Sequence, residues 1–286
     1  MKVLVTGATG FVGNYVVKEL LKNDHQVFAT SLNENKAKAF AWYDRVRYRP
    51  FNLAKFDGNF NYYKFFEEPD VIIHLAWEGL PNYNSLFHIE ENLFRHYSFL
   101  KNLVTNGSKD ITVTGTCFEY GLQEGELNES LPALPSNSYA IAKDTLRKFL
   151  EQLQKHVDYN LKWARLFYMH GEGQNPNSIL SQLEKALANN ENEFSMSLGE
   201  QIRDYTPVKI IAEHIVNIAM QKQVTGIINC CSGNPITINK LVESFLKKRN
   251  ETIKLNKGVY PYPLHEPLNF WGSVTKLNTI VNAQNT

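Results

Sequence analysis

Short apolar runs alternate with amphipathic stretches along the first half of the chain. Each run is bounded by polar or turn-forming residues, as expected for buried strands of a parallel sheet. The runs fall at residues 2–6, 26–30, 46–49, 71–76, 111–115 and 161–167. Between them apolar side chains recur at helical spacing, as at Val12, Val16 and Leu20. These repeated strand–helix–strand units predict a doubly wound α/β fold with helices on both faces of the sheet.

The pattern loosens after about residue 168, where stretches rich in Gly, Asn and Pro separate helical segments. Those segments fall at residues 178–189, 208–221 and 237–248. We therefore divide the chain into a domain at 1–168 and a smaller, mainly substrate-binding lobe at 169–286. The division does not exclude that segments of one part fold with the other. We expect a ligand cleft between the domain and the lobe.

Composition narrows the classes of protein and partner. The 30 Lys and Arg residues against 29 Asp and Glu give a net charge of +1, so no overall field attracts nucleic acid or anionic membranes. No apolar run approaches the roughly 18 residues of a membrane span, and the start of the chain does not look like a leader. Cys117, Cys230 and Cys231 lack metal-ligand spacing and are interpreted as reduced thiols. We expect a cytoplasmic protein with no metal, nucleic-acid or membrane partner.

The segment GATGFVG, residues 7–13, directly follows the first apolar run and precedes an amphipathic helix. Gly7 permits a tight turn, Gly10 lets the backbone approach a pyrophosphate, and Gly13 allows close helix packing. Free N–H groups at the start of the helix attract the anion. The segment predicts dinucleotide binding in a Rossmann-type domain. The alternative is a glycine-rich turn without a ligand, whereas a P-loop is disfavoured because no Gly-Lys-Ser/Thr follows.

The end of the second apolar run bears on the choice of dinucleotide. Thr30-Ser31-Leu32-Asn33 lacks the acidic residue that usually binds the ribose 2′-hydroxyl of NAD, and Lys36 and Lys38 follow. This favours NADP(H), with NAD(H) possible. Alternatively, the lysines are a solvated helix face.

The pattern Tyr-x-x-x-Lys identifies candidate catalytic pairs. It occurs at Tyr97/Lys101, Tyr139/Lys143 and Tyr205/Lys209. Pro207 interrupts the last pair, and no hydroxyl-bearing strand end precedes the first. Tyr139 and Lys143 follow Thr116, which lies just beyond the strand expected to end near Gly115. Position therefore favours Tyr139/Lys143 over a surface pair.

The spacing of this pair suggests a mechanism. Residues i and i+4 share one helix face, so the Lys143 ammonium can lie near the Tyr139 phenol. That charge, together with an oxidised nicotinamide, is expected to lower the pKa of the phenol and ready it for proton transfer. Thr116 is expected to hydrogen-bond the substrate oxygen.

Six segments, in order, resemble the extended short-chain dehydrogenase/reductase family: TGATGFVG, VIIHLA, VTGTCFEYG, SYAIAK, ARLFYMHGEGQ and GEQIRDYTPV. The resemblance covers nearly the whole chain and is greatest to reductases of 4-keto-6-deoxyhexose nucleotides, which serve bacterial surface-glycan synthesis. It implies a catalytic triad of Thr116, Tyr139 and Lys143 supported by Asn92. It also implies a homodimer formed through helices at about 85–106 and 139–155.

Two groups of relatives fit less well. The 4,6-dehydratases have Asp-Glu after the catalytic threonine, where this chain has Cys117 and Phe118, which cannot shuttle protons in the same way. The 4-epimerases have an Asn where this chain has Tyr168. These departures argue against dehydratase activity. They also weaken the interpretation as an epimerase, which stays open.

Further residues are candidates for the nucleotide-sugar site. Arg203 matches the arginine that clamps a diphosphate in the family, although it can instead form an ion pair between lobes. Arg165 lies in a strand-like run and is interpreted as structural, His74 as a packing residue, and His170 as a possible pocket residue. The expected substrate contacts are Trp77, Thr116, Cys117, Phe118, Tyr168, His170, Asn177 and Arg203. The expected cofactor contacts are Gly7, Thr9, Gly10, Phe11, Val12, Ser31, Asn33, Leu75, Ala76, Asn92, Tyr139 and Lys143.

Together these observations predict a reductase of the C4 ketone of a nucleotide-linked 4-keto-6-deoxyhexose, with dTDP-4-keto-6-deoxyglucose favoured by resemblance. Hydride would come from the cofactor and the proton from Tyr139. The alternatives are a nucleotide-sugar 4-epimerase and a catalytically silent NAD(P)-binding regulator.

Overall fold

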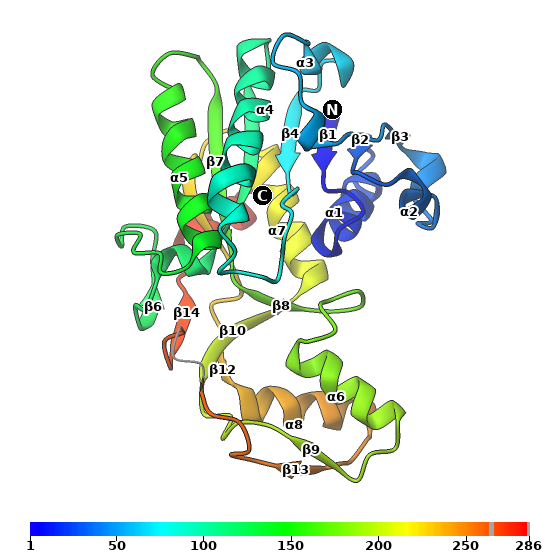
Figure 1. Ribbon diagram of the computed structural model, residues 1–286, viewed down its shortest axis with the longest axis vertical. Coiled ribbons are helices and arrows are strands. Elements are labelled where there is room, and N and C mark those ends of the chain that lie inside the picture. The colour runs from blue at the N-terminus through cyan, green and yellow to red at the C-terminus, as the bar shows by residue number, and fades with distance from the viewer. Residues whose placement is uncertain (263–265, 285–286) are drawn as a thin grey trace.

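The central feature of the computed structural model, which describes residues 1–262 and 266–284, is a parallel β-sheet (Figure 1). Within the described residues it has seven strands in the order β11-β7-β5-β4-β1-β2-β3. Their bounds are β1 Lys2–Thr6, β2 Gln26–Thr30, β3 Arg47–Tyr48, β4 Val71–His74, β5 Asp110–Thr116, β7 Asn160–Leu166 and β11 Gly226–Cys230. The strand order reverses between β1 and β4, which is where a doubly wound sheet opens to bind ligands.

Helices cover both faces of this sheet. They are α1 Phe11–Lys22, α2 Glu34–Lys38, α3 Tyr62–Phe65, α4 Leu93–Thr105, α5 Ser138–Leu153, α7 Val208–Met220 and α9 Thr275–Gln284. A π-helical turn, His88–Asn92, leads into α4. Along β1 the side chains alternate between two cores, because Val3 and Val5 face α1 and α7 whereas Leu4 faces α4 and α5. The sheet is thus buried on both sides, as the apolar strands predict.

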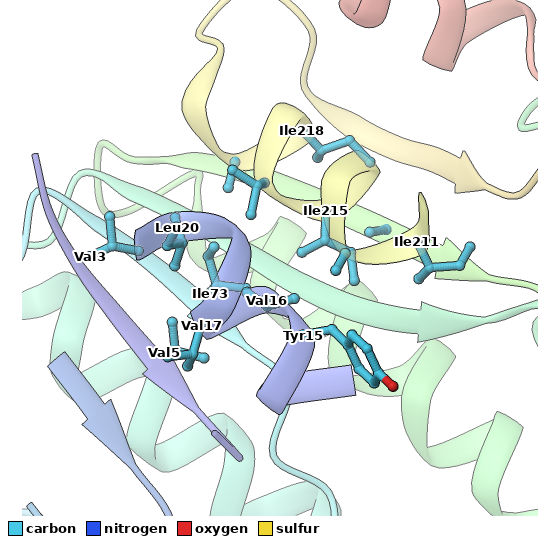
Figure 2. Close-up of a cluster of buried hydrophobic side chains, with 14 of the residues drawn as sticks. Val3, Val5, Tyr15, Val16, Val17, Leu20, Ile73, Ile211, Ile215 and Ile218 are labelled. Atoms are coloured by element: carbon cyan, nitrogen blue, oxygen red, sulfur yellow. The ribbon is translucent and has the colours of Figure 1, made fainter. Parts of the chain in front are cut away.

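Figure 2 shows the core on the α1 and α7 face. Val16 of α1 points toward Ile215 of α7, and Leu20 and Ile211 belong to the same core. All four are fully buried. This contact holds α1, and with it the glycine-rich loop, in a fixed place against the sheet.

A second lobe extends below the sheet in Figure 1. Its elements are β8 Tyr168–His170, α6 Ile179–Ala188, β9 Glu193–Ser195, β10 Ile202–Pro207, β12 Pro235–Thr237, α8 Ile238–Arg249 and β13 Lys254–Asn256. It has its own core around Leu183 and Val242. A further parallel pair joins β6 (Gly125–Leu127) to β14 (Phe270–Gly272). The chain passes between lobes more than once. β11, which follows residue 168, is a strand of the main sheet, and α7 packs on one face of that sheet.

The predicted doubly wound fold is confirmed. The six apolar runs form β1, β2, β3, β4, β5 and β7, and the three later helices are α6, α7 and α8. Among the described residues, no helix combines the length and apolarity needed to cross a membrane. Nor do the described residues contain a cluster of three or more metal-binding side chains. The three cysteines are free thiols.

Candidate active site

The glycine-rich loop joins β1 to α1 at the point where the strand order reverses. Gly10 precedes α1, and neither a side-chain cap nor an acidic residue occupies the first N–H groups of the helix. Gly7 has φ +69°, and a Cβ there would lie 2.8 Å from the backbone nitrogen of Ala76. A Cβ on Gly13 would overlap the Gly7 carbonyl oxygen. Side chains at Gly7 and Gly13 would therefore collide with neighbouring backbone atoms. With glycine there, the first N–H groups of α1 stay free to bind an anion, and the loop fits a dinucleotide pyrophosphate.

The phosphate-loop cavity lies beside this turn. It is lined by Thr6, Gly7, Thr9, Gly10, Thr30, Ser31, Leu32, Lys36, Phe51, Leu53, Leu75, Ala76, Trp77, Glu78 and Phe99. Six predicted cofactor contacts are therefore brought together here: Gly7, Thr9, Gly10, Ser31, Leu75 and Ala76.

Ser31 marks the end of this cavity that follows β2. It accepts a hydrogen bond from Thr9 (2.9 Å), and its hydroxyl lies 2.7 Å from that of Tyr48. Lys36 also lines the cavity, so a hydroxyl and an ammonium are both present there. Asn33 does not line it, because its side chain caps α2 by accepting from the backbone nitrogen of Lys36 (3.1 Å).

A catalytic cavity of about 290 Å³ adjoins the first. Its lining is Val12, Leu75, Trp77, Leu80, Tyr83, Thr114, Gly115, Thr116, Cys117, Phe118, Tyr139, Lys143, Leu166, Phe167, Tyr168 and Met169. Thr116 ends β5, and Asn137 caps α5 by accepting a hydrogen bond from Ala140 (2.9 Å). This cap starts the helix just before Tyr139, so Tyr139 and Lys143, one turn apart, both line the cavity with Thr116.

Lys143 lies deep in this cavity and is 1 % exposed. Its Nζ donates to the Thr114 carbonyl (2.6 Å) and lies 4.3 Å from the centroid of the Trp77 ring. Burial lowers the pKa of Lys143 to about 7, although the nearby Glu119 carboxylate acts in the opposite direction. The ammonium therefore has a carbonyl and an aromatic face as its closest partners.

Tyr139 is also buried, and its pKa is raised, first by burial and then by the Glu119 carboxylate. A hydrogen bond with Thr116 acts to lower it. Desolvation of the phenolate thus outweighs its favourable contacts within the protein. That Lys143 and an oxidised nicotinamide together lower this pKa stays a prediction.

The other two Tyr-x-x-x-Lys pairs are placed differently. Tyr97 of α4 packs edge-on against Phe149 of α5, with ring centroids 5.3 Å apart. Tyr205 lies in β10, whereas Lys209 lies in α7, so the two do not share a helix. Neither pair lines the catalytic cavity.

An outer cavity continues from the catalytic cavity into the second lobe. It is lined by Pro81, Tyr83, Tyr168, Met169, Asn175, Asn177, Ser178, Ile179, Ser197, Gln201, Arg203, Tyr205, Ile238 and Glu266. Tyr168 borders both cavities, and its hydroxyl is buried without a hydrogen-bond partner among the described residues. Substrate candidates Tyr168, Asn177 and Arg203 thus meet in one place.

Arg203 is engaged by the protein itself. It forms an ion pair with Glu266 (3.0 Å) and donates to the carbonyls of Ile202 (2.9 Å) and Leu268 (2.8 Å). Arg203 thus forms an ion pair, as the alternative interpretation holds, and its partner is Glu266. A diphosphate would have to compete with the Glu266 carboxylate for the guanidinium.

Several other candidates lie outside these cavities. His170, at the end of β8, borders a separate small cavity with Glu172 and Glu184. Phe11 packs against Tyr15 and lines none of the three cavities described above.

Asn92 and His74 serve the surrounding framework. Asn92 is buried and donates to the carbonyl of Glu78 (2.9 Å), which holds the segment after β4 without lining a cavity. His74 lies 2.8 Å from both Thr6 Oγ1 and His96 Nδ1, so it is a satisfied packing residue, as expected. Burial lowers its pKa to about 3, which keeps the imidazole neutral.

One group beside the triad was not predicted. The fully buried Glu119 carboxylate accepts from the backbone nitrogen of Thr116 (2.9 Å) and pairs with Arg165 (2.7 Å). Thr116-x-x-Glu119 has the spacing of a capping box, which is the sequence signal that could have identified it.

Comparisons with known proteins show which family this chain belongs to. Residues 3–231 match the family described as "NAD dependent epimerase/dehydratase family". The chain is 30% identical over 274 residues to dTDP-6-deoxy-L-talose 4-dehydrogenase (NAD(+)) of Aggregatibacter actinomycetemcomitans, covering 96% of this chain and 100% of the relative. It is 23% identical to dTDP-4-dehydro-6-deoxyglucose reductase of Escherichia coli, covering 93% and 87%.

Solved structures show the same fold. UDP-glucuronic acid 4-epimerase from Bacillus cereus, in complex with UDP-glucuronic acid and NAD, superposes with a TM-score of 0.81 at 21% identity, covering 99% of this chain and 93% of that one. The family match spans most of the chain, and the predicted resemblance is confirmed. The protein belongs to the NAD dependent epimerase/dehydratase family.

Proposed function

We propose that this protein is a nucleotide-sugar oxidoreductase that reduces the C4 ketone of a nucleotide-linked 4-keto-6-deoxyhexose, as a step in making surface-glycan sugars. The observation that carries the proposal is the meeting of Thr116, Tyr139 and Lys143 in a cavity with otherwise largely apolar walls. dTDP-4-keto-6-deoxyglucose is the favoured substrate, since the relatives described above are named for dTDP-linked 6-deoxysugars.

The residues of the cavity have separate roles in this reaction. Thr116 and Tyr139 hydrogen-bond the ketone oxygen, and Tyr139 donates its phenolic proton to that oxygen. The cofactor, when bound, supplies the hydride to C4, so that the carbonyl becomes a C–H and an O–H. Lys143 holds a positive charge near the phenol and stabilises the phenolate that is left. Solvent then returns the proton to Tyr139.

The walls of the catalytic cavity support a 6-deoxysugar. Leu80, Phe118 and Met169 line it, and Lys143 is the one charged side chain among the described lining residues. An apolar wall stabilises the C6 methyl of a deoxysugar, whereas a C6 carboxylate would be buried there without a partner. This argues against a uronic acid as the substrate.

The cofactor proposed is NAD(H). The 30% identical relative is named as NAD(+)-dependent, and solved structures of similar fold contain NAD. Ser31 and Lys36 supply polar groups beside the expected ribose, and no Asp or Glu follows β2 directly. Use of NADP(H) therefore remains part of the test, because these groups suit a 2′-phosphate.

The test is a cofactor-coupled assay. Purified protein is mixed with dTDP-4-keto-6-deoxyglucose and either NADH or NADPH while nicotinamide absorbance is followed. A separate assay offers dTDP-6-deoxy-L-talose with NAD(+), because its oxidation at C4 gives a different 4-keto-6-deoxyhexose nucleotide. Net oxidation of NADH that is lost in Tyr139→Phe supports the proposal. Sugar isomerisation without net cofactor change would identify a 4-epimerase, and cofactor binding without turnover of any sugar would identify a regulator.

A further inference from the structure

The buried carboxylate of Glu119 directly contacts the backbone of a proposed catalytic residue. Glu119 lies in the short turn Cys117–Tyr120 that follows β5, and its side chain is 0 % exposed. One of its oxygens, Oε1, accepts from the Thr116 nitrogen (2.9 Å), while the Thr116 hydroxyl accepts from the Phe118 nitrogen (3.3 Å). This reciprocal box fixes both the backbone and the side chain of Thr116.

The box also directs the hydroxyl proton of Thr116. A hydroxyl has one hydrogen to donate and two lone pairs to accept with. Because Phe118 occupies an acceptor position from the protein side, the hydrogen of Thr116 is left to point into the cavity toward Tyr139 and the substrate oxygen. A Thr116 without the box would be free to rotate.

The strand beside β5 holds the Glu119 carboxylate in place. Trp163 Nε1 donates to both carboxylate oxygens (3.0 Å each), and Arg165 Nε donates to Oε2 (2.7 Å). Both donors come from β7, whose register pairs Gly115 with Arg165. Three donors from two neighbouring strands, β5 and β7, thus converge on one carboxylate.

Gly115 is the residue that makes room for this arrangement. A Cβ at this position would overlap both Trp163 Nε1 and Glu119 Oε1. A glycine in a central strand costs roughly 0.5–1 kcal/mol of stability. The loss of stability caused by Gly115 in β5 is therefore explained by the space that the Glu119 carboxylate needs next to Thr116.

The ion pair is a poor choice for stability alone. Arg165 is 0 % exposed, its Nη1 and Nη2 have no hydrogen-bond partner among the described residues, and its guanidinium stacks 4.4 Å from the Tyr120 ring centroid. Apolar residues of similar volume often stabilise a fold as well as or better than a buried ion pair. A role in positioning the groups around it explains the pair better.

We propose that Glu119, supported by Arg165 and Trp163, is a positioning residue that holds Thr116 so that its hydroxyl faces the Tyr139 phenol. The inference rests on the proposed function, because Thr116 acts there on the substrate oxygen. Glu119 does not touch the substrate, and its effect passes through the hydrogen bond to the Thr116 nitrogen.

Two double variants separate this hydrogen bond from the ion pair. Glu119→Val/Arg165→Met removes both charges and the acceptor for Thr116, whereas Glu119→Gln/Arg165→Met removes the charges but keeps an amide oxygen as acceptor. We expect kcat to fall by about tenfold to a hundredfold in the first, with KM nearly unchanged. In the second, we expect kcat to stay within about threefold of the unaltered protein.

A second buried ion pair on the same two strands is the matched control. Lys162 of β7 pairs with Asp110 of β5 (2.8 Å) at the end of the sheet opposite the catalytic cavity. Asp110→Asn/Lys162→Met is therefore expected to leave kcat and KM unchanged, whatever it does to the melting temperature. NADH affinity, measured by fluorescence, is expected to be unchanged in the control. In the two Glu119 double variants it is expected to change equally, because both remove the carboxylate that supports the Lys143 ammonium.

The outcomes distinguish this inference from the proposed function. If the unaltered protein turns over none of the sugar nucleotides, the proposed function fails. If it is active but both Glu119 variants retain full kcat, or both lose it equally, positioning through the acceptor is overturned. Should Glu119→Val/Arg165→Met not fold, Glu119→Asp keeps the charge but shortens the reach to Thr116. Loss of kcat at constant KM would then support the inference, and full kcat would overturn it.

Discussion

Lys143 lies in surroundings that disfavour its own charge. The Glu119 carboxylate supports the ammonium. The pKa values of the nearby imidazoles of His74, His88 and His96 are lowered, first by burial and also by Lys143. The pKa of Lys143 is lowered from 10.5 to about 7 by burial. A group of this kind is costly to the fold, and such costs commonly coincide with functional sites.

The first prediction concerns this cost. The folded-state pKa of Lys143 lies below its unfolded value, so the folded protein binds this proton less tightly. Lys143→Met is therefore expected to raise the free energy of unfolding by about 1–4 kcal/mol below pH 7, with the gain shrinking as pH rises toward 10.5. Turnover should be abolished. Chemical denaturation at several pH values measures the change.

A matched control is Lys185→Met in α6, where the lysine is exposed. Its effect should stay within about 0.5 kcal/mol at every pH. A Lys143→Met protein that is less stable than the unaltered one would show that the ammonium is well compensated in the folded state.

The second prediction concerns cofactor affinity and rests on the proposed function. If the bound cofactor accepts a hydrogen bond from the Lys143 ammonium, binding requires the protonated form. With a pKa of about 7 in the free protein, NADH affinity should fall as pH rises above 7 by up to about tenfold per pH unit. Fluorescence titration across this range measures it. A flat profile, or one that persists in Lys143→Met, would assign the dependence to another group.

At the level of elements, the loop between β1 and α1 depends on close backbone packing. Gly13 belongs to α1, yet a Cβ there would overlap the Gly7 carbonyl and would lie 2.9 Å from the Ala8 Cα. Both are backbone atoms that cannot move without shifting the loop. α1 is in turn fixed by its contact with α7 in the core of Figure 2.

The third prediction follows from this packing. Gly13→Ala should force α1 and the loop apart, lower the free energy of unfolding by about 1–3 kcal/mol and weaken NADH binding. Gly58→Ala is the control, since a Cβ there would meet only a side-chain atom of Phe56 at 3.9 Å. Chemical denaturation and fluorescence titration measure the two effects. Equal behaviour of the two variants would show that the loop tolerates a side chain.

The sequence predicted the elements whose signals lie within one short segment of the chain. The apolar runs predicted the long strands, and the glycine spacing predicted the turn before α1. The short strands carry no such signal, because β14 pairs with β6 across about 145 residues of chain. The Glu119 contacts were missed for the same reason, since they depend on the register of β5 with β7. The Arg203–Glu266 pair likewise joins residues far apart in the chain.

At the scale of the whole molecule, hydrogen bonds tie the two lobes together beside the cavities. The buried carboxylate of Asp204, in β10, accepts from the backbone nitrogens of Ser232 (2.9 Å) and Gly233 (2.7 Å), directly after β11. β10 belongs to the second lobe and β11 to the central sheet. One fully buried acid therefore links a strand of the second lobe to the end of a strand of the central sheet.

The last prediction concerns assembly, for which α4 and α5 offer an outer surface. Phe94 and Ile141 lie near the starts of these two adjacent helices and are 54 % and 38 % exposed. Apolar side chains on neighbouring helices suit a symmetric interface in which each copy contributes the same surface. We expect a dimer in sedimentation velocity, and we expect Phe94→Glu/Ile141→Glu to be monomeric because it would bury two carboxylates in each half of the interface.

Leu198→Glu separates this interface from general exposure of apolar residues. Leu198 is 51 % exposed but lies in the second lobe, after β9. This variant should therefore sediment as the unaltered protein does. Phe94 and Ile141 line neither the catalytic cavity nor the phosphate-loop cavity, so the double variant should still bind NADH, and a loss of both dimer and binding would indicate unfolding. A monomeric unaltered protein, or a dimer dispersed only by Leu198→Glu, would place the interface elsewhere or exclude it.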